Sequence, residues 1–324
     1  MSWENWKRLW KWIKPILVIG LLLSFFYFVP IQDIFRALQS ANFAYFLVSI
    51  ILTIPIFYLS ALTLLILTRK QQIHYSIWEL LKMNLIIRFY SFFSPASILG
   101  SGMRWYQLSR GGKAAGALSA IAVDRALDIL IAVLLGLFWF LTGVRKDAFN
   151  PTALFLLFVI LVTGWFALTH WSPDASKWLA QKAEQTHLSW TRNLLRFSSH
   201  LFQSLSVYAS LSAAELTILL GASILSELIN LLIQVLLAFS LHIPISIVDL
   251  GWMRSLFFLA SLAPFTLTGG IGLREVTIVL VMSAFGIPPE LGGAYSLLSY
   301  ARAMLVSLTG GIFELRGLTR KNTE

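Results

Sequence analysis

The chain has no cysteine and few charged residues for its length. Its 324 residues include no Cys, and only 12% are Asp, Glu, Lys or Arg, against roughly 25% in an ordinary soluble domain. The absence of Cys excludes disulfides, thiol catalysis and Cys-ligated metal or iron–sulfur sites. Because the five histidines (His74, His170, His187, His200 and His242) are scattered without metal-ligand spacing, we expect no metal site and no cofactor.

Catalytic and nucleotide-binding motifs are also missing. The sequence has no Walker loop, dinucleotide fingerprint or nucleophile elbow. We therefore assign no catalytic residue and expect that the protein is not an enzyme. An enzyme would have to use carboxylates inside the membrane, such as Asp124, Glu227 and Glu275.

Apolar residues dominate instead. They make up 57% of the chain, and the mean hydropathy is +0.76. A soluble fold could not bury so much apolar surface, so we expect one integral membrane domain over 1–324. The net charge of +10 comes largely from basic residues in membrane-flanking loops, which meet anionic headgroups rather than nucleic acid.

The apolar stretches predict an all-α fold. A spanning helix needs about 20 apolar residues, and full spans are expected at 15–30, 43–67, 114–142, 152–169, 213–240 and 291–313. Two more stretches, 77–108 and 247–287, are interrupted by Pro and Gly. Non-helical backbone at membrane depth must be buried in protein or line a wet cavity. We therefore predict about six full spans and two re-entrant hairpins.

The basic residues predict the orientation. With the amino terminus in the cytoplasm, the outer loops hold only Arg36, Arg145 and Lys146 of the membrane-flanking basic residues. Both termini are then cytoplasmic. The polar stretch 171–212, with aromatic residues such as Trp178 and Trp190, is interpreted either as an amphipathic segment along the headgroups or as a simple linker between repeats.

The two interrupted stretches resemble each other. Pro95, Ser97, Gly100, Gly102 and Arg104 in the first correspond to Pro264, Thr266, Gly269, Gly272 and Arg274 in the second. The flanking spans run in opposite directions, which predicts an inverted repeat: 43–142, a connecting part 143–212, and 213–313. Inverted repeats with matched Gly/Pro interruptions are typical of transporters that bind their substrate near the bilayer midplane.

Charged residues inside the predicted spans mark candidate binding positions, because such residues usually face a bundle interior or an aqueous path. Arg125 and Asp128 can pair on one helix face. Glu227 lies on a polar stripe, and Arg302 would need a carboxylate partner, such as Glu227, or an anionic ligand. The predicted substrate-binding residues are Arg104, Asp124, Arg125, Ser97, Glu227, Asn230, Thr266, Gly269, Gly270, Gly272, Arg274, Glu275, Tyr295, Ser299 and Arg302.

These motifs resemble the lysylphosphatidylglycerol synthase transmembrane (flippase-like) family. The resemblance rests on Pro95 through Arg104, on Asp124-Arg125, and above all on the Gly-Gly-Ile-Gly-Leu-Arg-Glu stretch at 269–275. The family usually has an acidic residue ahead of the first-motif Arg, and 100–104 has none. No soluble aminoacyl-transferase domain is expected, since the chain ends shortly after its last span.

The resemblance implies a lipid translocase. It would move an anionic phospholipid or a polyprenyl-phosphate-linked lipid between the leaflets of a bacterial inner (plasma) membrane. The alternatives are an intramembrane enzyme that modifies a lipid-linked substrate and an accessory subunit that partners lipid-synthesis enzymes. The sequence assigns no oligomeric state.

Overall fold

The computed structural model describes residue 36 and residues 39–93, 98–110, 112–143, 152–186, 188–261 and 273–321. These residues form helices and connections with no strand among them, which confirms the predicted all-α membrane fold. In chain order the helices are α3 (Phe43–Ile51), α4 (Thr53–Lys70), α5 (Ile77–Phe93), α6 (Ile98–Ser109), α7 (Ala114–Thr142), α8 (Thr152–Glu184), α9 (Ser189–Ser206), the 3-10 helix η3 (Val207–Ser210), α10 (Ala213–Ser240), α11 (Ile247–Ser261), α12 (Leu273–Ala284) and α13 (Pro289–Lys321).

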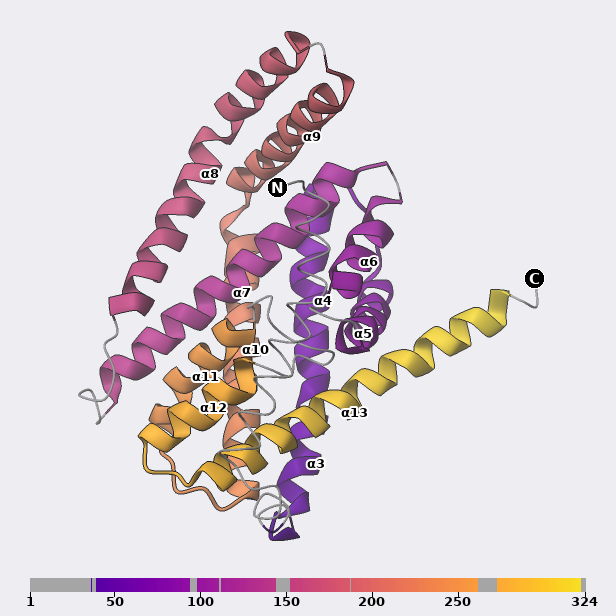
Figure 1. Ribbon diagram of the computed structural model, residues 1–324. Coiled ribbons are helices and arrows are strands. Elements are labelled where there is room, and N and C mark those ends of the chain that lie inside the picture. Colours follow the sequence, from indigo (N-terminus) through magenta and orange to yellow (C-terminus); the bar gives the residue numbers. More distant parts are fainter. Residues whose placement is uncertain are drawn as a thin grey trace, which may run out of the picture.

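Three helical segments among the described residues are long and apolar enough to cross a membrane: Phe43–Lys70, Ala213–Ser240 and Pro289–Glu314. The predicted spans 114–142 and 152–169 fall on α7 and on the first part of α8. The predicted span 15–30 lies outside the described residues. The polar stretch 171–212 continues α8 and then turns back as α9, and Ser199 Oγ donates to the carbonyl of Ser176 at 2.9 Å. Figure 1 shows α8 and α9 as an antiparallel pair at one side of the bundle.

Two long antiparallel helices form the centre of the bundle. The backbone N–H of Asn42, just before α3, donates to the carbonyl of Ser240 at the end of α10 (2.8 Å). At the opposite end, Lys70 Nζ lies 2.8 Å from Glu215 Oε2 at the start of α10. Ser212 and Glu215 form a capping box that fixes where α10 begins. The α3–α4 rod and α10 therefore lie side by side over their full length (Figure 1).

The turns after α4 and α10 have the same construction. Gln72 and His242 both adopt positive φ (56° and 54°), a left-handed conformation that is uncommon in residues other than Gly. In each turn the next N–H returns to the last helical turn, from Ile73 to Thr68 (2.9 Å) and from Ile243 to Ala238 (3.0 Å). α5 and α11 therefore leave the central pair in matching ways.

Two further crossings also correspond. α11 packs on α7, and α5 packs on α13. A Cβ at Gly136 of α7 would lie 2.4 Å from Ser255 Oγ of α11, and one at Gly310 of α13 would lie 2.0 Å from the carbonyl oxygen of Leu85 on α5. Only glycine allows helices to approach this closely.

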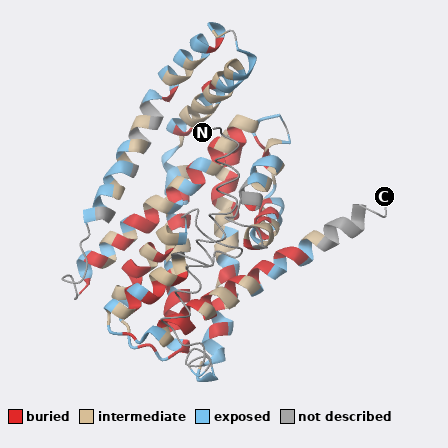
Figure 2. Ribbon diagram, in the orientation of Figure 1, coloured by how far each residue is buried: buried red, intermediate tan, exposed pale blue. Residues whose placement is uncertain are grey.

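In each interrupted stretch, a residue near its start contacts a residue near its end. For the first, Tyr75 OH donates to the carbonyl of Gln107 (2.8 Å), so the start of α5 lies beside the end of α6. For the second, the rings of Trp252 in α11 and Phe285 after α12 lie 5.5 Å apart between centroids. Figure 2 shows the buried residues concentrated where α10–α13 cross the central helices, whereas most of α8 is exposed or half-buried.

Candidate functional site

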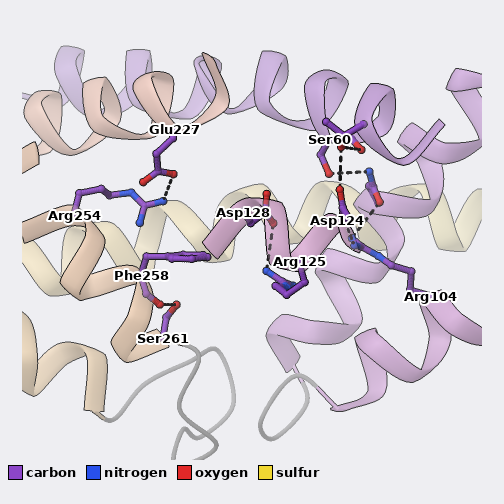
Figure 3. Close-up of polar contacts among 11 residues, drawn as sticks. Ser60, Arg104, Asp124, Arg125, Asp128, Glu227, Arg254, Phe258 and Ser261 are labelled. Carbon is purple, nitrogen blue, oxygen red and sulfur yellow. Dashed lines mark hydrogen bonds and ion pairs between the residues drawn. The ribbon is translucent and has the colours of Figure 1, made fainter. Parts of the chain in front are cut away.

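Charged and polar side chains from both halves of the chain lie where the helices of the bundle pack together. Figure 3 shows the ion pair of α10 and α11, the ion pair on α7, and the cluster around Asp124 in one continuous row. These side chains lie within the bundle, where a charged group is costly unless it is paired or binds a ligand. Among the described residues no group of three His, Asp or Glu could hold a metal ion.

Asp124 is the centre of the first cluster. Its Oδ1 accepts from Thr63 Oγ1 at 3.0 Å, and its Oδ2 lies 3.5 Å from Arg104 Nη1. Arg104 Nη2 also donates to Asn84 Oδ1 (3.2 Å), and Asn84 Nδ2 donates to Ser60 Oγ (3.4 Å). The cluster ties α4, α5, α6 and α7 together, and it brings the predicted residues Arg104 and Asp124 into contact.

Arg125 and Asp128 form the predicted pair on α7. Arg125 Nη1 lies 3.7 Å from Asp128 Oδ2, and the two side chains are 52% and 46% exposed. They are more exposed than the other ion-paired side chains in the row of Figure 3.

Glu227 pairs with Arg254, a residue that the sequence analysis did not select. Arg254 Nη2 donates to Glu227 Oε2 at 3.0 Å, and its guanidinium carbon lies 5.4 Å from the centroid of the Phe258 ring. Of the alternatives left open for Arg302, a pair with Glu227 is not formed, because α11 packs beside α10 and supplies Arg254 at hydrogen-bond distance. Asn230 does not join this pair by a direct hydrogen bond, since its Nδ2 donates to the carbonyl of Ser226 on its own helix (3.0 Å).

The predicted residues of α12 and α13 do meet. Arg274, the second residue of α12, donates from Nη2 to Ser299 Oγ at 2.5 Å, and its Nη1 lies 3.9 Å from the buried carboxylate of Glu275. Tyr295 is fully buried one helical turn before Ser299, and its hydroxyl donates to Gln234 of α10. Tyr295 therefore fixes α13 against α10 rather than pointing at the arginines.

Arg302 is buried in the middle of α13. Only 8% of its surface is exposed, and its Nη1 donates to Thr53 Oγ1 of α4 at 2.9 Å. Its Nε atom is buried without a hydrogen-bond partner. Arg302 also lies within electrostatic range of Arg88, Arg274 and Arg254.

Arg88 is the second residue that the sequence analysis did not select. It lies near the end of α5 with an exposed side chain, within electrostatic range of Arg274 and Arg125. Its place just ahead of the first Pro/Gly interruption was the signal that could have identified it. With Arg88, arginines from α5, α7, α12 and α13 meet in one region.

Five predicted binding residues, Ser97, Thr266, Gly269, Gly270 and Gly272, lie outside the described residues. The two motif arginines also differ in their local setting. Arg104 lies in the middle of α6, whereas Arg274 lies in the first turn of α12. The similarity between the two motifs thus does not place their arginines at equivalent positions of the two short helices.

The described fold and its charged interior define a multi-pass helical membrane protein with a polar site between its helices. Residues 11–311 match the family model described as the lysylphosphatidylglycerol synthase TM region. The chain belongs to this family, as its motifs predicted. No curated protein and no solved structure matches the chain.

Proposed function

We propose that this protein translocates lipids with an anionic headgroup between the two leaflets of the membrane. The observation that carries the proposal is the set of arginines inside the bundle that are bound by hydroxyl groups. Arg302 is held by Thr53 and Arg274 by Ser299. Hydroxyl groups orient a guanidinium but do not neutralise it, so Arg302, which forms no ion pair among the described residues, is suited to an incoming anion. Arg274, which also faces Glu275, lies within electrostatic range of Arg302.

The physical difficulty of lipid exchange is desolvation of the headgroup. A phosphate that leaves water must exchange its hydration for other donors, or pay a large cost in free energy. Guanidinium groups offer several N–H donors in a planar arrangement that matches phosphate oxygens. Arginines on α5, α12 and α13 would lower the barrier by replacing water around the headgroup while the acyl chains remain in lipid.

The arrangement of the helices supports a transporter with an inverted repeat. The turns at Gln72 and His242, and the glycine crossings at Gly136 and Gly310, recur in α4–α7 and α10–α13. The bond from Tyr75 to Gln107 favours a re-entrant first hairpin. We propose that the two halves rock about the central pair α4–α10, with both termini in the cytoplasm of a bacterial cell.

Leaflet exchange in proteoliposomes tests the proposal. Purified protein would be reconstituted with a trace of fluorescent phosphatidylglycerol, and the dye in the outer leaflet would be bleached with a membrane-impermeant reductant. Translocation predicts that the protected half of the dye becomes accessible in vesicles that contain protein, and that mass spectrometry finds the lipid unchanged. A new lipid product would favour the intramembrane enzyme, and exchange equal to that of protein-free vesicles would favour an accessory role.

A further inference from the structure

The carboxylates of the site are all matched to arginines. Among the described residues, the four acidic side chains of the interior each lie within ion-pair distance of one arginine, in the pairs Asp124–Arg104, Asp128–Arg125, Glu227–Arg254 and Glu275–Arg274. Each pair is neutral overall. The charge of the site is therefore decided by the arginines that remain.

Arg88 and Arg302 are those two arginines. Neither forms an ion pair within the part of the chain that the structure describes, and each lies within electrostatic range of Arg274. The next carboxylate along α13, Glu314, accepts a hydrogen bond from Tyr90 (3.2 Å). The interruptions at 94–97 and 262–272 contain no charged residue in their sequence. Counted over the described residues, the site thus carries two positive charges in excess.

Two unneutralised like charges this close together are costly. Arg302 is buried, so its charge loses hydration without gaining a carboxylate partner, and the exposed Arg88 nearby repels it. The cost is removed when a ligand brings the opposite charge. A ligand with one negative charge would neutralise only half of the excess.

We propose that the headgroup bound between Arg88 and Arg302 is doubly negative: a terminal phosphate, as in a lipid phosphomonoester or a lipid diphosphate. This inference rests on the proposed function and names its substrate class. A terminal phosphate presents three oxygens, which lets two guanidinium groups bind it side by side with Arg274 close by. A phosphodiester such as phosphatidylglycerol has only two unsubstituted oxygens and a single charge.

Binding measurements test the charge of the headgroup. Thermal stabilisation of the detergent-solubilised protein would be titrated with phosphatidic acid, with phosphatidylglycerol of the same acyl chains, and with inorganic phosphate alone, at a pH where the phosphomonoester is doubly ionised. The parent protein should bind phosphatidic acid at least about tenfold more tightly than phosphatidylglycerol, since its second negative charge allows a further charge-assisted hydrogen bond.

Variants that change the charge of the site give opposite expectations. Arg88→Gln lowers the excess and should reduce the preference for phosphatidic acid by about tenfold, whereas Asp128→Asn raises the excess and should increase it. Arg110→Gln removes an exposed arginine that stacks on Tyr106 (5.2 Å), and should leave the preference unchanged. Because Asp128 is half-exposed, its variant should fold even if an arginine variant does not.

The outcomes separate this inference from the proposed function. Equal affinity for phosphatidic acid and phosphatidylglycerol, or an Asp128→Asn variant with a weaker preference, would overturn the doubly negative headgroup, although leaflet exchange could still occur. Inorganic phosphate that binds as tightly as phosphatidic acid would overturn the assignment to a lipid. A preference for phosphatidic acid without any leaflet exchange would support the headgroup charge and contradict translocation.

Discussion

The ion pair between Glu227 and Arg254 should contribute to stability only as an intact pair. Their 3.0 Å contact joins side chains that are 14% and 12% exposed. At an effective dielectric constant of about 20, two unit charges at this distance attract by about 5 kcal/mol, which is offset largely by the desolvation of both groups. Removal of one partner leaves the other charge buried alone, which costs about 3–5 kcal/mol.

A double-mutant cycle measures this contribution. Glu227→Gln and Arg254→Gln should each lower the free energy of unfolding in mixed micelles by about 3 kcal/mol. The double variant carries no buried charge at this position and should recover to within about 1–2 kcal/mol of the parent. The matched control is Asp174→Asn, whose contact with Lys177 is 3.9 Å long and highly exposed, and which should change stability by less than about 0.5 kcal/mol.

Additive losses would refute the reasoning. If the double variant is destabilised by the sum of the two single losses, Glu227 and Arg254 do not compensate each other. Glu227 and Arg254 would then contribute independently to the packing of α10 and α11. Only three of the four ion pairs assigned to the site would remain.

Three further predictions concern the helix crossing, the anion site and the topology. Gly310→Ala places a methyl group against a backbone carbonyl of α5 and should lower stability by about 2 kcal/mol, whereas Gly221→Ala, where a Cβ has nothing within 4 Å, should be tolerated in the same unfolding assay. Arg274→Lys keeps the charge but loses the planar guanidinium group with its several N–H donors, and should slow lipid exchange at least about tenfold. An exchange rate equal to that of the parent would show that the anion binds elsewhere. Single cysteines at Tyr75 and Ser101 in this Cys-free chain should react with an impermeant maleimide from the same side of the vesicle, and labelling from opposite sides would contradict the re-entrant hairpin.

The long apolar helices were predictable because composition and length define them directly. The spans expected at 114–142 and 213–240 coincide with α7 and α10. The span expected at 152–169 covers only the first part of its helix, since α8 continues to Glu184 through Pro173. The polar residues beyond 169 pack on α9 instead of ending the helix, a tertiary contact that hydropathy does not encode.

The site was only partly predictable, for a related reason. Polar side chains in apolar helices identified Asp124, Arg274 and Arg302, because burial of such groups requires a function or a partner. The partners themselves depend on how the helices pack. Arg254 and Arg88 lie on the helices that flank the interruptions, where a charged side chain is equally consistent with a position at the membrane–water interface. Only the positions of α11 and α5 in the bundle show that these two arginines belong to the site.

The most direct test of the central claim is the rate of lipid exchange in vesicles that contain equal numbers of correctly folded molecules of the parent, Arg302→Gln or Arg110→Gln. Arg302 is buried and bound by Thr53, whereas Arg110 lies outside the site on the exposed turn after α6. The account predicts that Arg302→Gln slows exchange of an anionic lipid by at least about tenfold and that Arg110→Gln exchanges it at the parental rate. An Arg302→Gln protein that folds normally and exchanges the lipid as fast as the parent would contradict the claim that the headgroup crosses the membrane through these arginines.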